Sequence, residues 1–111
     1  MSAARAQATR RFSEVFSALG DETRLRLVGR LCDEGPLSIT ALSSGLPVTR
    51  QAVSRHLAVM ESAGLVRGER QGREQVYRLE PARLAEARQR LAELSAEWDR
   101  RLERLRAMVE S

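Results

Sequence analysis

Residues 37–65 carry the local signals that best define the fold of this chain, and their sequence is LSITALSSGLPVTRQAVSRHLAVMESAGL. It carries two sets of helix-start signals, because Ser38 and Thr49 can each cap a helix and are each preceded by an apolar residue that can pack onto the first turn. Gly64 supplies a left-handed stop for the second helix. Two short capped helices joined by a tight connection predict a helix-turn-helix over residues 38–63.

The second of these helices has an apolar face and a polar face. Val53, Leu57 and Met60 recur at helical spacing, so they are expected to point inward. The outward side chains can match phosphate oxygens and base edges in a DNA groove. These candidate DNA contacts are Thr49, Arg50, Gln51, Ser54 and Arg55. His56 lies nearer the buried edge, as a packing residue or a phosphate contact, and a merely solvated polar face is the alternative for the whole set.

A second motif follows directly, LVRGERQGREQVYRLE at residues 65–80. Two short runs flank Gln71-Gly72-Arg73, where the glycine indicates a tight turn, so a two-stranded ribbon is expected. A ribbon placed after such a helix is typical of the wing of a winged helix. Its arginines can enter a minor groove or hold the DNA backbone, which makes Arg73 and then Arg70 candidate contacts. A solvated hairpin charged by chance is the alternative.

Helices are also expected at the two ends of the chain, over residues 3–19 and 81–109. The last one has an apolar seam at heptad-like spacing and is too long for the remaining core to cover. We therefore expect a homodimer in which a twin helix covers the seam, although a helix folded wholly onto its own domain is the alternative. The expected interface residues are Phe12, Phe16, Leu84, Leu91, Leu94, Trp98, Leu102 and Leu105.

Residues 21–35 predict a scaffold helix that Asp21 caps and that carries a wide apolar stripe. Cys32 lies on this stripe, so we expect it to be a small buried thiol. A single cysteine excludes an internal disulfide and is typical of a protein from a reducing compartment.

Length and hydropathy describe one globular domain, residues 1–111. No apolar run approaches the ~18 residues of a membrane span, and the first residues lack the apolar core of a secretory signal. We therefore expect a cytoplasmic protein. No nucleophile–base–acid set and no phosphate-binding loop is recognisable, so we expect neither an enzyme, nor catalytic residues, nor a cofactor.

The basic residues point to an anionic partner. All 19 are arginines, and they give a formal net charge of +4 at pH 7. Arginine suits bidentate recognition of phosphate and guanine, although genomic codon usage can also produce this bias. Between nucleic acid and an acidic membrane surface, the helix-turn-helix favours double-stranded DNA.

The chain resembles the ArsR/SmtB family of winged-helix repressors. The resemblance rests on ALGDETRLRLV at 18–28, TRQAVSRHLAVMESAGLV at 49–66 and GREQVYRL at 72–79. It implies a mainly α winged helix-turn-helix with about five helices and a two-stranded wing, assembled as a homodimer through its terminal helices. It further implies recognition by residues 49–56, a wing at residues 71–73, and release from operator DNA when an inducer binds.

The sequence departs from the metal-sensing members of that family. Where those proteins often carry a Cys-x-Cys pair, this chain has Ala41-Leu42-Ser43-Ser44, and its last helix has no histidine. Cys32 and His56 alone cannot form a four-coordinate zinc site, so no metal is expected and the chain looks like a non-metal branch. A small-molecule inducer of unknown identity is left open.

These observations predict a sequence-specific transcriptional regulator, most simply a dimeric repressor of its own or an adjacent operon, on a near-palindromic operator. Two alternatives belong to other classes. An architectural protein would coat DNA through the same arginines without sequence preference. A helix-mediated interaction module would bind another protein through the last helix.

Overall fold

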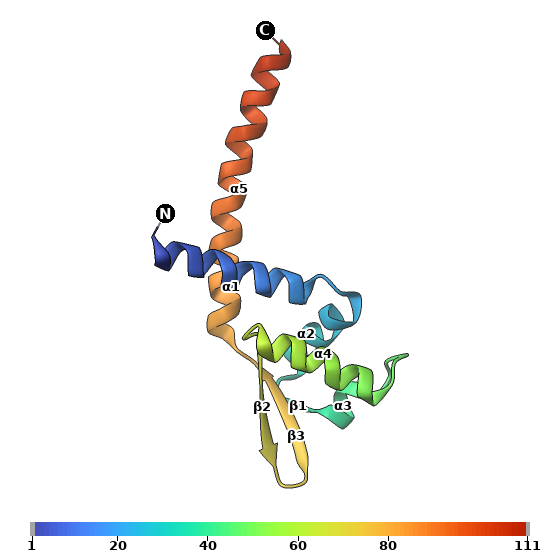
Figure 1. The fold of residues 1–111 in the computed structure, drawn as a ribbon. Helices are drawn as coiled ribbons and strands as arrows, with labels where there is room; N and C mark the ends of the chain where they lie inside the picture. Colours follow the sequence, from blue (N-terminus) through green and yellow to red (C-terminus); the bar gives the residue numbers. More distant parts are fainter. Residues whose placement is uncertain (1, 111) are drawn as a thin grey trace.

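The computed structural model describes residues 2–110. Met1 and Ser111, the ends of the expected domain, lie outside the described residues. Figure 1 shows a small helical body, a hairpin projecting from one end of it and a long helix projecting from the other. In chain order the elements are α1 (Ala3–Leu19), α2 (Glu22–Glu34), β1 (Leu37–Ser38), α3 (Ile39–Ser43), α4 (Arg50–Ser62), β2 (Val66–Gln71), β3 (Glu74–Leu79) and α5 (Pro81–Glu110).

The helices begin and end where the local sequence signals predict. The side-chain oxygens of Asp21, Ser38 and Thr49 each accept a hydrogen bond from the backbone N–H three residues further on, at 3.0, 3.1 and 3.0 Å. Gly64 follows α4 at a φ of +79°, which only glycine adopts without steric cost. These caps satisfy backbone groups that a helix leaves without an internal partner. The expected helix-turn-helix is therefore formed by α3 and α4.

The wing has one more strand than the sequence indicated. β1 pairs with β3 as an antiparallel strand, which gives a three-stranded sheet in the order β1-β3-β2. A strand of two residues is too short to display an alternating pattern, and its second residue, Ser38, also caps α3. β1 thus joins the base of the wing directly to the helix-turn-helix.

The inward face of α4 lies at the centre of the core. Val53, Leu57 and Met60 are all 0% exposed, as the helical spacing predicted. They belong to the same cluster as Leu27 of α2 and Leu42 of α3, which are equally buried. The recognition helix is therefore held by both neighbouring helices, and its rotation about its own axis is fixed by this burial.

The expectation of a buried Cys32 was wrong. The thiol is exposed, and Leu25 on the same helix is 53% exposed. Only Leu27 and Leu31 of α2 are buried, so the apolar stripe that contacts the core is narrower than the sequence pattern indicated. Cys32 follows Leu31 by one helical step of about 100°, which turns it away from the core.

α1 and α5 cross near the start of α5 (Figure 1). An ion pair of 3.6 Å joins Arg11 Nε to a carboxylate oxygen of Glu86, and Phe12 and Leu84 pack against the core from these two helices. Ala87 is the one buried residue in the described part of α5. Most of this helix therefore projects from the body, as its length led us to expect.

The wing is packed tightly at its base. The backbone of Gly68 in β2 lies opposite Tyr77 in β3, whose side chain is 8% exposed. Burial raises the pKa of the Tyr77 phenol. A Cβ added to Gly68 would lie 2.8 Å from Tyr77 Cε1 and 2.8 Å from Gln75 Nε2. The close approach of this ring therefore requires glycine at position 68.

We expect Gly68→Ala to destabilise the protein by about 1–3 kcal/mol, because the buried ring of Tyr77 would have to move. The matched control is Gly29→Ala, since a Cβ at this helical position meets nothing within 4 Å. That substitution should raise stability by about 0.5–1 kcal/mol. Urea unfolding at one fixed protein concentration measures the stability of both variants. Equal unfolding midpoints for the two would contradict the close packing of Tyr77 against Gly68.

Candidate nucleic-acid interface

The outward side of α4 presents a set of polar side chains to solvent. Arg50, Gln51, Ser54 and Arg55 are all exposed, while the opposite face of the helix is buried. Thr49 is also exposed, and its hydroxyl oxygen accepts the N–H of Ala52, which leaves its O–H free to donate. The N-terminus of a helix carries a partial positive charge, so this end of α4 attracts anions such as phosphate.

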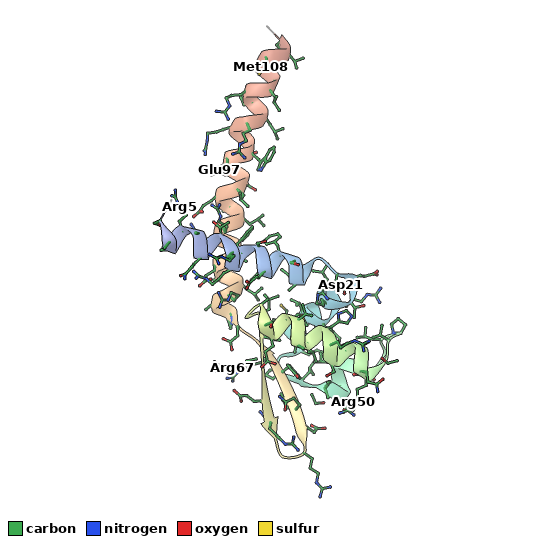
Figure 2. The ribbon with its side chains drawn as sticks, in the orientation of Figure 1. Arg5, Asp21, Arg50, Arg67, Glu97 and Met108 are labelled. Carbon is green, nitrogen blue, oxygen red and sulfur yellow. The ribbon has the colours of Figure 1, made fainter. Side chains whose placement is uncertain are left out.

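A hollow of about 490 Å³ lies between the first half of α4 and the wing. Arg50, Gln51 and Ser54 line it from α4, and Gln75 and Tyr77 line it from β3. Figure 2 shows Arg50 at the end of α4 that lies farthest from α5. The structure therefore brings three of the sequence-predicted residues together beside the wing, whereas the exposed Arg55 does not line this hollow.

The arginines of the wing fall into two groups. Arg67 and Arg78 are neutralised by carboxylates, Arg67 Nε lying 3.5 Å from Glu80 and an Arg78 amine nitrogen 2.7 Å from Glu69. Arg70 and Arg73 have no acidic partner within ion-pair distance among residues 2–110. Arg50 and Arg55 on α4 are equally free of acidic partners in this part of the chain. Four guanidiniums are thus available to an external anion, two on α4 and two on the wing.

His56 has partners inside the protein. Its Nδ1 lies 3.1 Å from an amine nitrogen of Arg24, which also donates from Nε to the carbonyl of Ala18 at 2.6 Å. Because arginine can only donate, Nδ1 accepts and the neutral ring carries its proton on Nε2. This chain of contacts links the end of α1, the start of α2 and the recognition helix. His56 is thus half-buried at this junction, beside the exposed face of α4.

A carboxylate completes this junction. Asp21 Oδ2 lies 3.9 Å from His56 Nδ1 and accepts the backbone N–H of Arg24. That hydrogen bond holds the pKa of the Asp21 carboxyl below its ordinary value, and the charge of the Arg24 guanidinium acts in the same direction. Asp21 is therefore ionised at neutral pH, and the junction holds an acid, an arginine and an imidazole.

The residues expected at a dimer interface divide into two sets. Phe12 and Leu84 pack against the chain's own core, and Leu94 is half-buried. The remaining apolar side chains are between 40% and 56% exposed. They are Phe16, Leu91, Trp98, Leu102 and Leu105. A row of apolar side chains therefore lies bare along the projecting part of α5.

Sequence reasoning missed three contributors to this region. Gln75 and Tyr77 line the hollow beside α4, and the partly alternating pattern of β3 placed them on one face without relating that face to α4. Arg24 is 32 residues away from His56, and no local pattern connects the two.

Across residues 2–110, no three His, Cys, Asp or Glu side chains are grouped in a way that could hold a metal ion. No helix of this part of the chain is long and apolar enough to cross a membrane.

Comparison with known sequences points to one group of proteins. Residues 19–69 match the family described as "Helix-turn-helix domain". The chain is 40% identical over 96 residues to the HTH-type transcriptional regulator Rv2034 of Mycobacterium tuberculosis, and the match covers 86% of each protein. It is 38% identical over 68 residues to the arsenical resistance operon repressor of Escherichia coli, covering 61% of this chain and 58% of the repressor.

A solved structure gives the same result. The ArsR-like transcriptional regulator from Rhodococcus sp. RHA1 superimposes with a TM-score of 0.74 at 37% sequence identity. The match covers 90% of this chain and 93% of the Rhodococcus chain. The likeness therefore extends over the terminal helices as well as the helix-turn-helix and the wing.

We expect Arg73→Ala to weaken binding to duplex DNA of any sequence and to lower the slope of log affinity against log salt by about one unit, because one unpaired cation is lost. The control is Arg78→Ala, whose guanidinium is already paired with Glu69. Fluorescence anisotropy of a labelled duplex between about 50 and 200 mM salt measures both slopes. The same reduction in both variants would contradict the division of the wing arginines.

Proposed function

The chain belongs to the ArsR/SmtB family of helix-turn-helix regulators and is thus a DNA-binding transcriptional regulator, and on that premise we propose that it is a homodimeric repressor of its own or an adjacent operon. The observation that carries the proposal is the set of four unpaired guanidiniums on α4 and the wing. In a protein whose other wing arginines are neutralised by carboxylates, this distribution favours an anionic partner at one surface.

The proposed contacts divide into base recognition and backbone positioning. Gln51 and Ser54 are the proposed base contacts, because an amide and a hydroxyl at the middle of an exposed helical face can reach base edges in the major groove. Arg50 and Arg55 bind bases or phosphate, and Thr49 donates to a phosphate at the helix N-terminus. In the wing, Arg73 and Arg70 hold the backbone or enter the minor groove.

The proposed dimer rests on the bare seam of α5. Its apolar side chains follow one face of a helix that leaves the body, and Trp98 at its centre is 52% exposed. A second copy of the same helix offers a matching apolar surface. Two recognition helices would then enter successive major grooves about 34 Å apart on a near-palindromic operator.

We propose further that the inducer, where one acts, is a small molecule and not a metal ion, because the chain has Ala41-Leu42-Ser43-Ser44 in place of a Cys-x-Cys pair and no histidine in its last helix. The proposed site of action is the cytoplasm, and no enzymatic activity is proposed. Sequence-specific DNA binding accounts for the exposed polar face of α4 and the free arginines of the wing, and it requires no catalytic group.

The experiment that tests the function is selection of bound duplexes from a random DNA pool at near-physiological salt. Enrichment of an inverted repeat with half-sites about one helical turn apart supports the dimeric repressor. Binding without enrichment would replace it with an architectural protein, and no retained DNA would favour a protein-interaction module.

On the enriched duplex, we expect Arg55→Ala to cost about 1–3 kcal/mol of binding free energy, because an exposed, unpaired guanidinium on the recognition helix is removed. The control Arg26→Ala removes an exposed arginine that lies on α2 and pairs with Glu22. An operator affinity unchanged by Arg55→Ala would remove this residue from the proposed contacts.

For the dimer, we expect Trp98→Ala to raise the dimer dissociation constant by roughly 30-fold, the effect of about 2 kcal/mol at an interface hot spot. The folded monomer should persist, since the Trp98 side chain is already half-exposed in the single chain. Arg100→Ala, an exposed position on the opposite side of α5, is the control. Sedimentation over a concentration series measures the constant, and a wild-type value for Trp98→Ala would argue against the seam as the interface.

A further inference from the structure

The guanidinium of Arg30 reaches from α2 to the end of α3. One of its amine nitrogens lies 2.8 Å from the carbonyl oxygen of Ala41, 3.3 Å from that of Leu42 and 3.4 Å from that of Ser44. Its Nε donates to Glu34 at 2.9 Å, one turn further along α2. The side chain is 30% exposed, so these contacts are partly shielded from water.

The three carbonyls that Arg30 contacts lie at the C-terminal end of α3, where a helix leaves carbonyl groups without a partner. The last carbonyls of any helix lack a partner within the helix, and α3 has only five residues, Ile39–Ser43. A helix of this length is not stable by itself, so its position depends on contacts with neighbouring elements. Leu42 supplies an apolar contact from one side, and Arg30 supplies charge-assisted hydrogen bonds at the C-terminal end.

Between α3 and the recognition helix, Leu46 and Val48 pack against the core, while the backbone of this segment makes few hydrogen bonds. Gly45 adopts a φ of +79°, and the backbone N–H of Leu46 makes only a long hydrogen bond of 3.5 Å to Ser43. Thr49, which caps α4, follows shortly after. The contact of Arg30 with the carbonyl of Ser44 adds a polar restraint at the start of the connection that leads to Thr49 and Arg50.

A neighbouring arginine provides the comparison. Arg26 lies one turn before Arg30 on α2 and forms an i,i+4 ion pair with Glu22 at 2.9 Å, just as Arg30 pairs with Glu34 at 2.9 Å. Among the described residues, Arg26 makes no hydrogen bond or ion pair with the helix-turn-helix. The two residues therefore share a helix, a charge and an ion pair of the same length with a carboxylate one turn away, and differ in the carbonyls that Arg30 holds.

We propose that Arg30 is a positioning residue for DNA recognition: it holds the end of α3 and the following turn, and so sets where the N-terminus of α4 meets the DNA, without touching the DNA itself. The inference rests on the proposed function. It assigns to a residue outside the recognition helix and the wing part of the sequence specificity of the protein. It also accounts for a half-buried arginine whose charge is already balanced by Glu34.

The test compares Arg30→Met with the control Arg26→Met on two duplexes, the one enriched from the random pool and a scrambled duplex of the same composition. We expect Arg30→Met to raise the dissociation constant for the enriched duplex about tenfold or more. Affinity for the scrambled duplex and the salt slope should stay as in the wild type, since no phosphate contact is lost. Arg26→Met should change none of these quantities.

Other results would overturn the proposal. A salt slope lowered by about one unit would make Arg30 a direct phosphate contact, and an equal loss on both duplexes would indicate a general loss of fold. Unchanged affinity for the enriched duplex would leave Arg30 without a role in recognition. Arg30→Lys keeps the charge but lacks the forked donors, so it should show a smaller loss of the same kind and serves if Arg30→Met does not fold.

Amide hydrogen exchange separates this proposal from the proposed function, because it needs no DNA. In Arg30→Met, the backbone amides of residues 39–49, Pro47 excepted, should exchange about tenfold faster or more than in Arg26→Met, while those of α2 stay protected. Equal exchange rates in the two variants would show that Arg30 does not hold the end of α3, even if the protein binds an operator. If the wild-type protein enriched no duplex, the proposed repressor function would be refuted. The exchange rates would still show whether Arg30 holds α3.

Discussion

The burial of one face of α4 is the constraint on which the rest of the structure depends. Val53, Leu57 and Met60 are fully removed from solvent, and rotating the helix by one residue would expose them. This burial leaves the opposite face to polar side chains, and α2, α3 and β2 are arranged around the buried face. The polar surface is therefore a consequence of the core, and its position relative to the wing follows from the same packing.

The arginines differ in whether they have a partner within the protein, and this difference determines where the protein is most positive. Most arginines in the helical body and at the base of the wing have a carboxylate, a carbonyl or a ring as partner, for example Arg30 with Glu34 and Arg24 with the ring of His56. Paired arginines contribute little to the field outside the protein, because their charge is locally balanced. The unpaired arginines of α4 and the wing tip, such as Arg55 and Arg73, consequently dominate the field at that end of the molecule.

The sequence predicted the features that local patterns can carry. Each helix cap is formed within three residues, and the inward face of α4 follows from a repeat of three and four residues, so both could be recognised without a structure. Contacts between distant segments could not be recognised, such as Arg24 with His56 or Arg30 with the end of α3, because they depend on how whole elements pack. The exposure of Cys32 belongs to the same class, since the sequence shows that a helix has an apolar stripe but not how much of it the neighbours cover.

The bare seam of α5 has a consequence for control of gene expression. Under the proposed pairing, chains must find each other before two recognition helices can act on one operator. Below the dimer dissociation constant, the concentration of pairs rises with the square of the chain concentration. Operator occupancy then responds to protein level more steeply than it would for a single-chain binder. A repressor that limits its own synthesis would in this way maintain its level near a threshold, and the length of one helix would help to set that threshold.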